Sequence, residues 1–227
     1  MEAINILGIE TSTHHCSVAF FQNGNLIANR LLSEEGSHSK MLTLLIDEIC
    51  KEVSISLENL HAIAVSIGPG SYTGLRIGLS TAKGLCYGND LPLICLNTLH
   101  ILAEAAKVKY PEHLLCPMID ARRMEVYTCL LNSKGEELIP TQAKILTEDF
   151  LCDTNQKIIA FGNGSSKWKE ICNHTTLQFE SNFDYPNAVF MGKLANDYYL
   201  NKKFENLVTI EPTYLKEFMG TQPKKLL

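Results

Sequence analysis

Short apolar runs alternate with polar loops along the first half of the chain, and their spacing predicts strands and helices in turn. Two of the runs flank Asn23-Gly24, which is a strong signal for a hairpin turn between strands. Between residues 37 and 53, apolar side chains recur every three or four positions, as on the buried face of an amphipathic helix. The first half therefore predicts the order βββαβαβα, over residues 4–9, 16–21, 26–32, 37–53, 61–67, 73–87, 93–96 and 98–106.

The second half repeats the pattern. The apolar run 114–119 ends in Asp120, as the run 4–9 ends in Glu10. A new strand and a turn follow in both halves, and later apolar runs in both halves end in Gly-x-Gly-Ser before a helix. Such self-similarity indicates a duplicated unit.

The repeat predicts an α/β protein of two related lobes, each of the βββαβα type. We expect the first lobe over residues 1–106 and the second over 107–227. Alternatively, the C-terminal segment returns to the first lobe.

The densest cluster of glycines lies at residues 66–78, which read S-I-G-P-G-S-Y-T-G-L-R-I-G. Gly68 and Gly70 fall in the turn between a predicted strand and helix, and Gly162 and Gly164 occupy the equivalent turn of the second half. A helix-opening turn presents amide N–H groups that suit a nucleotide phosphate. The alternative is a tight connection, in which glycine allows two parts of the backbone to approach closely.

Glu10 and Asp120 end the first strand of each half, beside a polar loop. Ligands of open α/β sheets bind outside the carboxyl ends of the strands, so the two carboxylates are candidates to face each other across a cleft between the lobes. Alternatively, each carboxylate caps the turn that follows it.

The helix predicted over residues 73–87 carries a stripe of small residues, and Arg76 lies in its first turn. Small residues every four positions allow another helix to approach closely, and the 37–53 helix adds apolar residues outside its main apolar face. Packing onto the sheet is the alternative. The candidate interface residues are Met41, Leu44, Leu45, Gly74, Gly78 and Ala82. Arg76 is a candidate contact for a nucleotide or a partner, or a solvated arginine.

Composition narrows the function classes. The formal net charge is −5, from 20 basic and 25 acidic residues, and no basic run exceeds two residues, which argues against autonomous nucleic-acid binding. The eight cysteines form no C-x-x-C pair and lie mostly in apolar runs, so we expect reduced thiols and no zinc motif. No apolar span reaches eighteen residues. We therefore expect a soluble, cytoplasmic protein without membrane contact.

Four motifs resemble those of the TsaB (YeaZ) family, in the same order and over nearly the whole chain. They are L-G-I-E-T-S-T at 7–13, G-P-G-S-Y-T-G-L-R-I-G at 68–78, D-A-R-R-M-E-V-Y at 120–127 and P-T-Y-L at 212–215. The resemblance implies an actin-like fold, shared with sugar kinases and the heat-shock ATPase domain.

It also implies a bacterial subunit that supports the synthesis of threonylcarbamoyladenosine beside the tRNA anticodon without catalysing it. The implied partners are a catalytic TsaD-like paralogue and a TsaE-like ATPase, with a homodimer when the chain is unpartnered and tRNA contacted only through the complex. No cofactor, metal or catalytic residue of its own is expected, and ATP or ADP would lie at the interface with the paralogue.

One sequence difference from the catalytic paralogue bears on whether the chain is itself an enzyme. The paralogue holds a metal through H-x-x-x-H on its first helix, whereas the chain has His38 followed by Leu42 at the second position. A metallopeptidase is therefore disfavoured. The remaining alternative is a nucleotide-dependent kinase or hydrolase that uses Glu10 and Asp120 in its own cleft.

Overall fold

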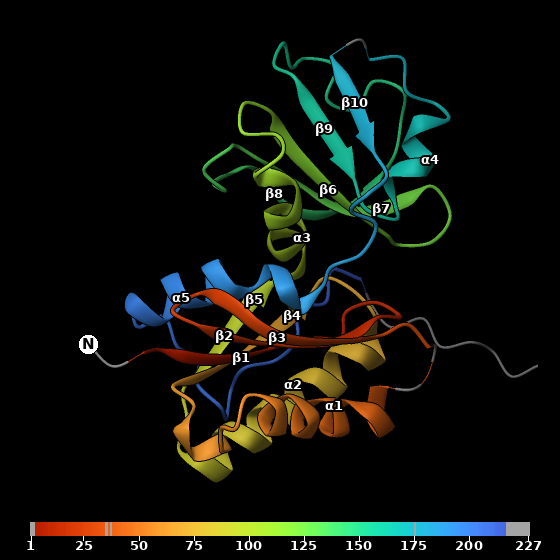
Figure 1. The fold of residues 1–227 in the computed structure, drawn as a ribbon. Helices are drawn as coiled ribbons and strands as arrows, with labels where there is room; N and C mark the ends of the chain where they lie inside the picture. Colours follow the sequence, from red (N-terminus) through yellow and green to blue (C-terminus); the bar gives the residue numbers. More distant parts are fainter. Residues whose placement is uncertain (1–2, 35, 37, 175, 217–227) are drawn as a thin grey trace, which may run out of the picture.

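The computed structural model describes residues 3–34, 36, 38–174 and 176–216. It has two lobes, each built on a five-stranded sheet (Figure 1). No helix within the described residues is long and apolar enough to cross a membrane.

The first sheet has the order β3-β2-β1-β4-β5. Strands β1, β2 and β3 pair antiparallel, and β4 and β5 extend the sheet in parallel. These strands are β1 (Asn5–Glu10), β2 (Cys16–Gln22), β3 (Asn25–Leu32), β4 (Ala62–Gly68) and β5 (Leu93–Asn97). The helices that follow them in sequence are α1 (His38–Glu52), the short η1 (Leu57–Asn59), α2 (Tyr72–Asn89) and α3 (Thr98–Lys107).

The second sheet has the order β10-β9-β6-β7-β8, which is the same topology read from the other edge. Its elements are β6 (Leu114–Asp120), β7 (Glu125–Leu131), β8 (Glu137–Ile145), β9 (Ile158–Phe161), α4 (Ser165–Lys169) and β10 (Leu177–Glu180). The predicted duplication is thus confirmed for the strands.

The two units differ where the first has α1. The repeat predicts a helix between the third and fourth strands, but residues 146–157 of the second unit form turns and bends. This stretch is rich in Asp, Asn and Thr, which favour turns, and it lacks the long apolar periodicity of residues 37–53.

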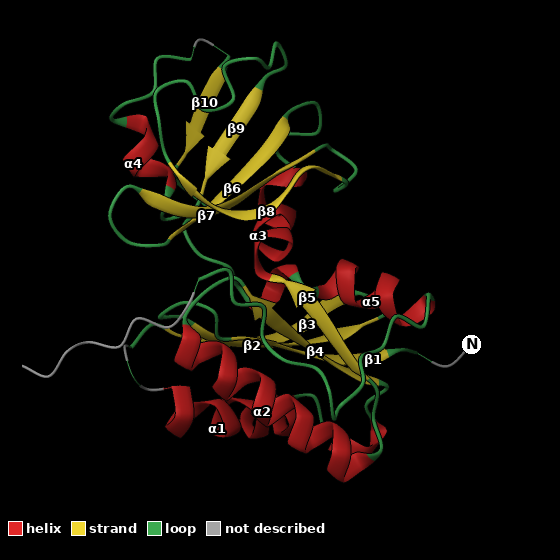
Figure 2. Cartoon of the chain, turned by 180° about the vertical axis from the view of Figure 1, so that it is seen from behind, coloured by secondary structure: helices red, strands yellow, loops and turns green. Residues whose placement is uncertain are grey.

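Successive side chains of a strand point to opposite faces of the first sheet, and helices cover both faces. Leu7 and Ile9 join a core with α1 and α2 on one face, while Ile6 points to the other face, with η2 (Ala188–Phe190) and α5 (Gly192–Leu200). Figure 2 shows α1 and α2 side by side under the sheet, with α5 above it. The runs of β1, β2, β4 and β5 are almost continuously apolar because both sides of these strands are buried, whereas the edge strand β3 is mostly exposed.

The lobes exchange helices. Although α3 directly follows β5, its residues Leu99, Leu102 and Ala106 pack in the core of the second sheet. Conversely, α5 follows β10 in sequence, yet Ala195 packs on the first sheet beside Phe21. Helix α3 also keeps contact with the first lobe, because Ile101 lies in the core on the first sheet, so α3 packs between the two sheets.

Two glycines of α2 provide a test of how its small-residue stripe is used. A Cβ at Gly78 would lie 2.2 Å from the Thr11 hydroxyl oxygen, whereas a Cβ at Gly84 would meet nothing within 4 Å. We expect Gly78→Ala to lower the free energy of unfolding by about 1–3 kcal/mol through overpacking. Gly84→Ala should raise it by about 1 kcal/mol, because alanine is the better helix former. Urea denaturation of both variants checks this, and equal shifts in the same direction would contradict it.

Candidate functional site

Glu10, Asp120 and the candidate glycines of the two turns lie where the first strand of each lobe ends beside a helix-opening turn. In the first lobe, the loop after β1 lies against the turn between β4 and α2: the amide of Ser71 donates to the carbonyl oxygen of Ser12 at 2.6 Å. In the second lobe, the amide of Gly164 donates to the carbonyl oxygen of Met118 at 3.1 Å. Met118 lies within β6, so the second lobe holds its turn against the strand, whereas the first lobe holds its turn against the loop after the strand.

Glu10 is fully buried at the end of β1. Its Oε1 accepts a hydrogen bond of 2.5 Å from the amide of Ser12, and within the described residues Oε2 has no hydrogen-bond partner. Burial raises the pKa of this carboxyl, and the hydrogen bond from the amide of Ser12 offsets only part of that effect. A buried carboxyl of this kind favours the neutral form.

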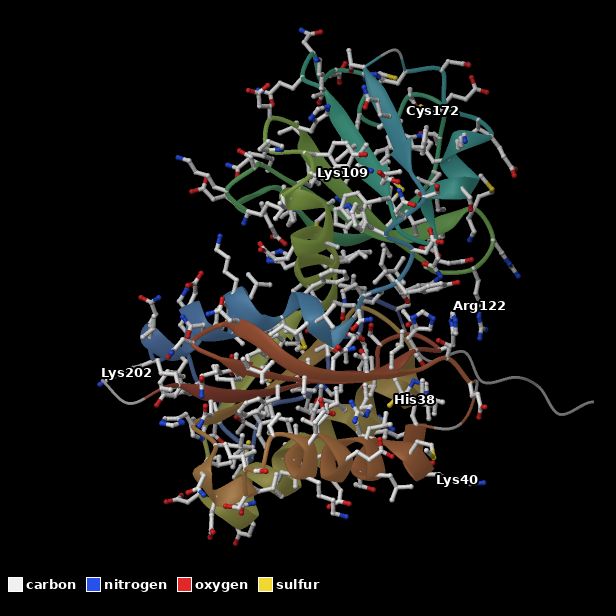
Figure 3. The ribbon with its side chains drawn as sticks, in the orientation of Figure 1. His38, Lys40, Lys109, Arg122, Cys172 and Lys202 are labelled. Atoms are coloured by element: carbon white, nitrogen blue, oxygen red, sulfur yellow. The ribbon has the colours of Figure 1, made fainter. Side chains whose placement is uncertain are left out.

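Asp120 occupies the equivalent position in the second lobe but stays 40% exposed. Its Oδ1 accepts from the amide of Arg122 at 2.6 Å and from Lys167 Nζ at 2.5 Å. Glu10 and Asp120 therefore both cap the turn that follows their strand, the simpler of the two alternatives. Figure 3 shows Arg122 at the end of the second lobe that faces the first.

The glycines of the first turn are required by close approach within the chain. A Cβ at Gly70 would lie 2.4 Å from the carbonyl oxygen of Ser12, and one at Gly74 would lie 2.1 Å from that of Thr11. The amide of Gly74 donates to Ser71 Oγ, the N-cap of α2. Internal packing thus accounts for the glycines, and internal hydrogen bonds occupy amides that a phosphate would need.

The second turn is built in the same way. Gly162 has φ +96°, and a Cβ there would lie 2.2 Å from the carbonyl oxygen of Met118. The amide of Asn163 donates to the carbonyl oxygen of Asp184 at 2.8 Å, while its side-chain oxygen accepts from the amide of Asp120. Gly164 approaches the end of β6 closely as well, since its Cβ would lie 3.1 Å from the nitrogen of Asp120.

The C-terminal segment completes the first turn; the sequence analysis raised its return to the first lobe as an alternative without saying what it contacts. The amide of Thr213 donates to the carbonyl oxygen of Ile67 at 2.7 Å, and a Cβ at Gly68 would lie 2.6 Å from the carbonyl oxygen of Thr213. Gly68 has φ +117°, a conformation that favours glycine. The P-T-Y-L motif was the available signal, because it singled out this segment without saying what it contacts.

Arg76 is held by the same segment. Its Nε donates to the hydroxyl oxygen of Tyr214 at 2.9 Å, and its guanidinium lies 4.1 Å from the ring centroid of Tyr72. The two tyrosine rings stack, with centroids 4.6 Å apart. Two residues later, Lys216 Nζ donates to the carbonyl oxygen of Ala121 in the second lobe. The segment therefore connects α2 to the loop between β6 and β7.

The candidate interface residues divide into two groups. Leu45, Gly74, Gly78 and Ala82 are buried within the first lobe, so the structure gives these four an internal packing role. On α1, Leu44 is 51% exposed and Met41 is partly exposed. The expected interface therefore rests on Met41 and Leu44 among these residues, and it stays a prediction.

The histidine at the start of α1 has a partner of its own. His38, labelled in Figure 3, places Nε2 3.1 Å from the carbonyl oxygen of His15. Leu42, where a metal-binding paralogue would carry its second histidine, is buried in the core against the first sheet. This position serves packing.

The state of Glu10 can be tested through pH. Because its pKa in the folded state lies above the value of 4.5 for the unfolded chain, the folded protein holds this proton more tightly. Its stabilising contribution is therefore complete below pH 4.5 and is lost as the pH rises through the folded-state pKa. We expect Glu10→Gln to remove this loss.

The measurement is urea denaturation between pH 4 and pH 8. The difference in stability between Glu10→Gln and the unmodified chain should grow with pH in favour of the variant. Glu112→Gln, which changes an exposed carboxylate, should give no such trend. Parallel curves for Glu10→Gln and the unmodified chain would contradict the assignment.

Comparison with solved structures identifies the fold. YeaZ from Pseudomonas aeruginosa aligns with a TM-score of 0.79 at 24% identity, covering 93% of this chain and 100% of that one. The inorganic polyphosphate/ATP-glucomannokinase of Arthrobacter sp. strain KM aligns with a TM-score of 0.52 at 8% identity, covering 86% and 98%. These likenesses concern fold alone, and they confirm the expectation of an actin-like fold in two α/β lobes.

Comparison of sequences identifies the family. A family model described as TsaD, tRNA N6-adenosine threonylcarbamoyltransferase, matches residues 25–227. The transferase of Streptococcus equi subsp. equi is 33% identical but aligns with 47% of this chain and 37% of its own length. The tRNA threonylcarbamoyladenosine biosynthesis protein TsaB of Haemophilus influenzae is 32% identical over 95% of both chains, and that of Escherichia coli is 28% identical over 94% and 95%. Because the TsaB of Haemophilus influenzae is 32% identical over 95% of both chains, the chain belongs to the TsaB (YeaZ) family.

Proposed function

We propose that this chain is a non-catalytic subunit that supports a TsaD-like transferase as it adds a threonylcarbamoyl group to the adenosine beside the tRNA anticodon. The relatives from Haemophilus influenzae and Escherichia coli, which match 95% and 94% of the chain, are named for threonylcarbamoyladenosine biosynthesis. The proposal adds that the chain acts by holding its partner and carries out no chemical step of its own.

The observation that carries the non-catalytic part is the burial of Glu10. An acid that orients a metal ion and water at a γ-phosphate must be ionised and must reach the ligand. Glu10 has no exposed surface, and its pKa is raised by burial. Glu10, at the end of β1, therefore stabilises the fold and does not contact a ligand.

The competing function, a kinase or hydrolase that works in its own cleft, is less well supported. It needs Glu10 and Asp120 as an ionised pair, but Asp120 is bound to Lys167 and Glu10 is enclosed. It also needs free amides in the glycine turns, and the amide of Ser71 is bonded within the chain. We propose accordingly that any ATP or ADP lies at the contact with the transferase.

The proposed partners are a TsaD-like transferase and a TsaE-like ATPase, with tRNA reached only through the complex. The half-exposed Leu44 and the partly exposed Met41 lie one turn apart on α1 and together offer apolar surface that a second protein chain would cover. We propose that α1 forms this contact, and that a second copy of the chain covers it when the transferase is absent.

Reconstitution tests the function directly. Threonylcarbamoyl transfer to tRNA is measured with the transferase and its companion proteins, with and without this chain, and ATP turnover is measured for this chain alone. We expect transfer to require the chain, the chain alone to turn over no ATP, and Glu10→Gln to support transfer like the unmodified chain. ATP turnover by the chain alone that Glu10→Gln abolishes would overturn the proposal.

The contact surface is tested by Leu44→Glu. Because Leu44 is half exposed, the charge should leave the fold intact and weaken binding to the transferase at least about tenfold. Leu200→Glu is the matched control, since Leu200 is 61% exposed on α5, over the opposite face of the first sheet. Equal affinities of the two variants in a binding titration would show that α1 is not the contact.

A further inference from the structure

Three side chains of different chemistry converge beside α3. They are His100 on α3, Cys129 on β7 and Glu137 on β8. One ligand atom from each lies within 4.8 Å of the other two, and His100 Nε2 is 2.8 Å from Glu137 Oε1. Among the described residues, this is the group of His, Cys, Asp and Glu side chains whose ligand atoms come close enough to share an ion.

The group has an inner and an outer side. Cys129 is 1% exposed, so its sulfur forms the buried floor. The side chains of His100 and Glu137 are 26% and 32% exposed and form the rim. An ion could therefore enter from solvent and meet the thiol at the base, without unfolding the lobe.

The rim is held in place by hydrogen bonds from behind. The hydroxyl of Thr141 donates to Glu137 Oε1 at 2.9 Å, and the side-chain amide of Asn97 donates to Thr141 Oγ1 at 2.9 Å. Outer hydrogen bonds of this kind orient the ligands of metal sites. They come from β8 itself and from the last residue of β5, where the chain crosses between the lobes.

We propose that His100, Cys129 and Glu137 bind one zinc-class divalent cation, with its fourth position open to water. Imidazole, thiolate and carboxylate together suit Zn²⁺ and Co²⁺ and do not suit Mg²⁺ or Ca²⁺, which prefer oxygen ligands alone. The thiolate and carboxylate balance the two charges of the ion. The cation takes the place of the hydrogen bond between His100 Nε2 and Glu137 Oε1.

Binding requires the proton of the Cys129 thiol to leave. Burial raises the pKa of the Cys129 thiol, so the metal-free chain carries S–H at neutral pH. On binding, the S–H bond breaks, the S–metal bond forms and the proton passes to solvent. Glu137 is prepared for the ion already, because the hydrogen bonds from His100 and Thr141 outweigh its partial burial and lower its pKa.

The proposed site would fasten α3 to two strands of the second lobe. Motif spacing does not indicate it, because residues 100, 129 and 137 come from three separate elements. The binding of an ion to the folded chain alone raises the thermal midpoint, so stability provides a readout that is independent of any activity. The inference does not depend on the proposed role in tRNA modification.

The test is a titration of the purified full chain, stripped of metal by chelation, with Co²⁺ and with Zn²⁺. We expect one ion per chain, a thiolate-to-Co²⁺ charge-transfer absorption, release of protons and a higher thermal midpoint with Zn²⁺. His100→Gln, Cys129→Ala and Glu137→Gln should each weaken binding at least about tenfold. Circular dichroism establishes that each variant is folded.

Matched controls are Cys116→Ala, a buried cysteine of the same sheet, His61→Gln in the first lobe, and Glu136→Gln, next to Glu137 in sequence. These three should bind like the unmodified chain. The absence of stoichiometric binding would overturn the proposal. Co²⁺ binding without a thiolate band, or binding unaffected by the partly exposed His100→Gln, would overturn it equally.

Discussion

The close approach of the α2 turn to the loop after β1 is the contact on which the rest of this structure depends. Helix α2 can lie on the sheet only because Gly70 and Gly74 leave room for the carbonyl oxygens of Ser12 and Thr11. A side chain at either position would push the helix from the strand ends. The hydroxyl of Thr11 then donates to the carbonyl oxygen of Gly74 at 2.8 Å, so the tight contact is also a polar one. Sterics and hydrogen bonding here favour the same geometry.

This contact also explains why a nucleotide-type motif and a supporting role are compatible. A glycine-rich turn before a helix can bind a phosphate when its amides have no other partner and the surrounding residues leave space for the phosphate. In this chain the neighbouring residues lie close to the turn. The carbonyl oxygen of Ser12 accepts a hydrogen bond from the amide of Ser71, and the carbonyl oxygen of Thr213 lies against Gly68. The same residue types that could cradle a ligand are used to fill the space that it would occupy. The second lobe repeats this solution at Gly162, against the carbonyl oxygen of Met118.

Much of the fold could be predicted from local patterns, since strands covered on both faces read as apolar runs and the duplicated order repeats visibly. The sequence could not show which sheet a helix packs on: α3 packs on both, with Leu102 in the core of the second sheet and Ile101 in that of the first. It identified Glu10, Asp120 and the glycines as unusual, but burial decided their roles. The role of the small residues of α2 was also ambiguous in the sequence, because a stripe of small residues allows close approach of either a partner helix or a loop of the same chain. The contacts of Thr213 and Tyr214 span too much sequence for any local pattern to reveal.

The exchange of helices has a consequence for how the protein forms during synthesis. The face of the first sheet that includes Phe21 and Ile94 is covered by Met191 and Ala195, which leave the ribosome long after the five strands that they cover. Until then the nascent first lobe exposes apolar surface of the kind that promotes aggregation. The contacts that close it join distant parts of the sequence, which slows folding. The first lobe to be translated is therefore the last to be completed, and a ribosome stalled before α5 would release a half-covered sheet for chaperones to bind.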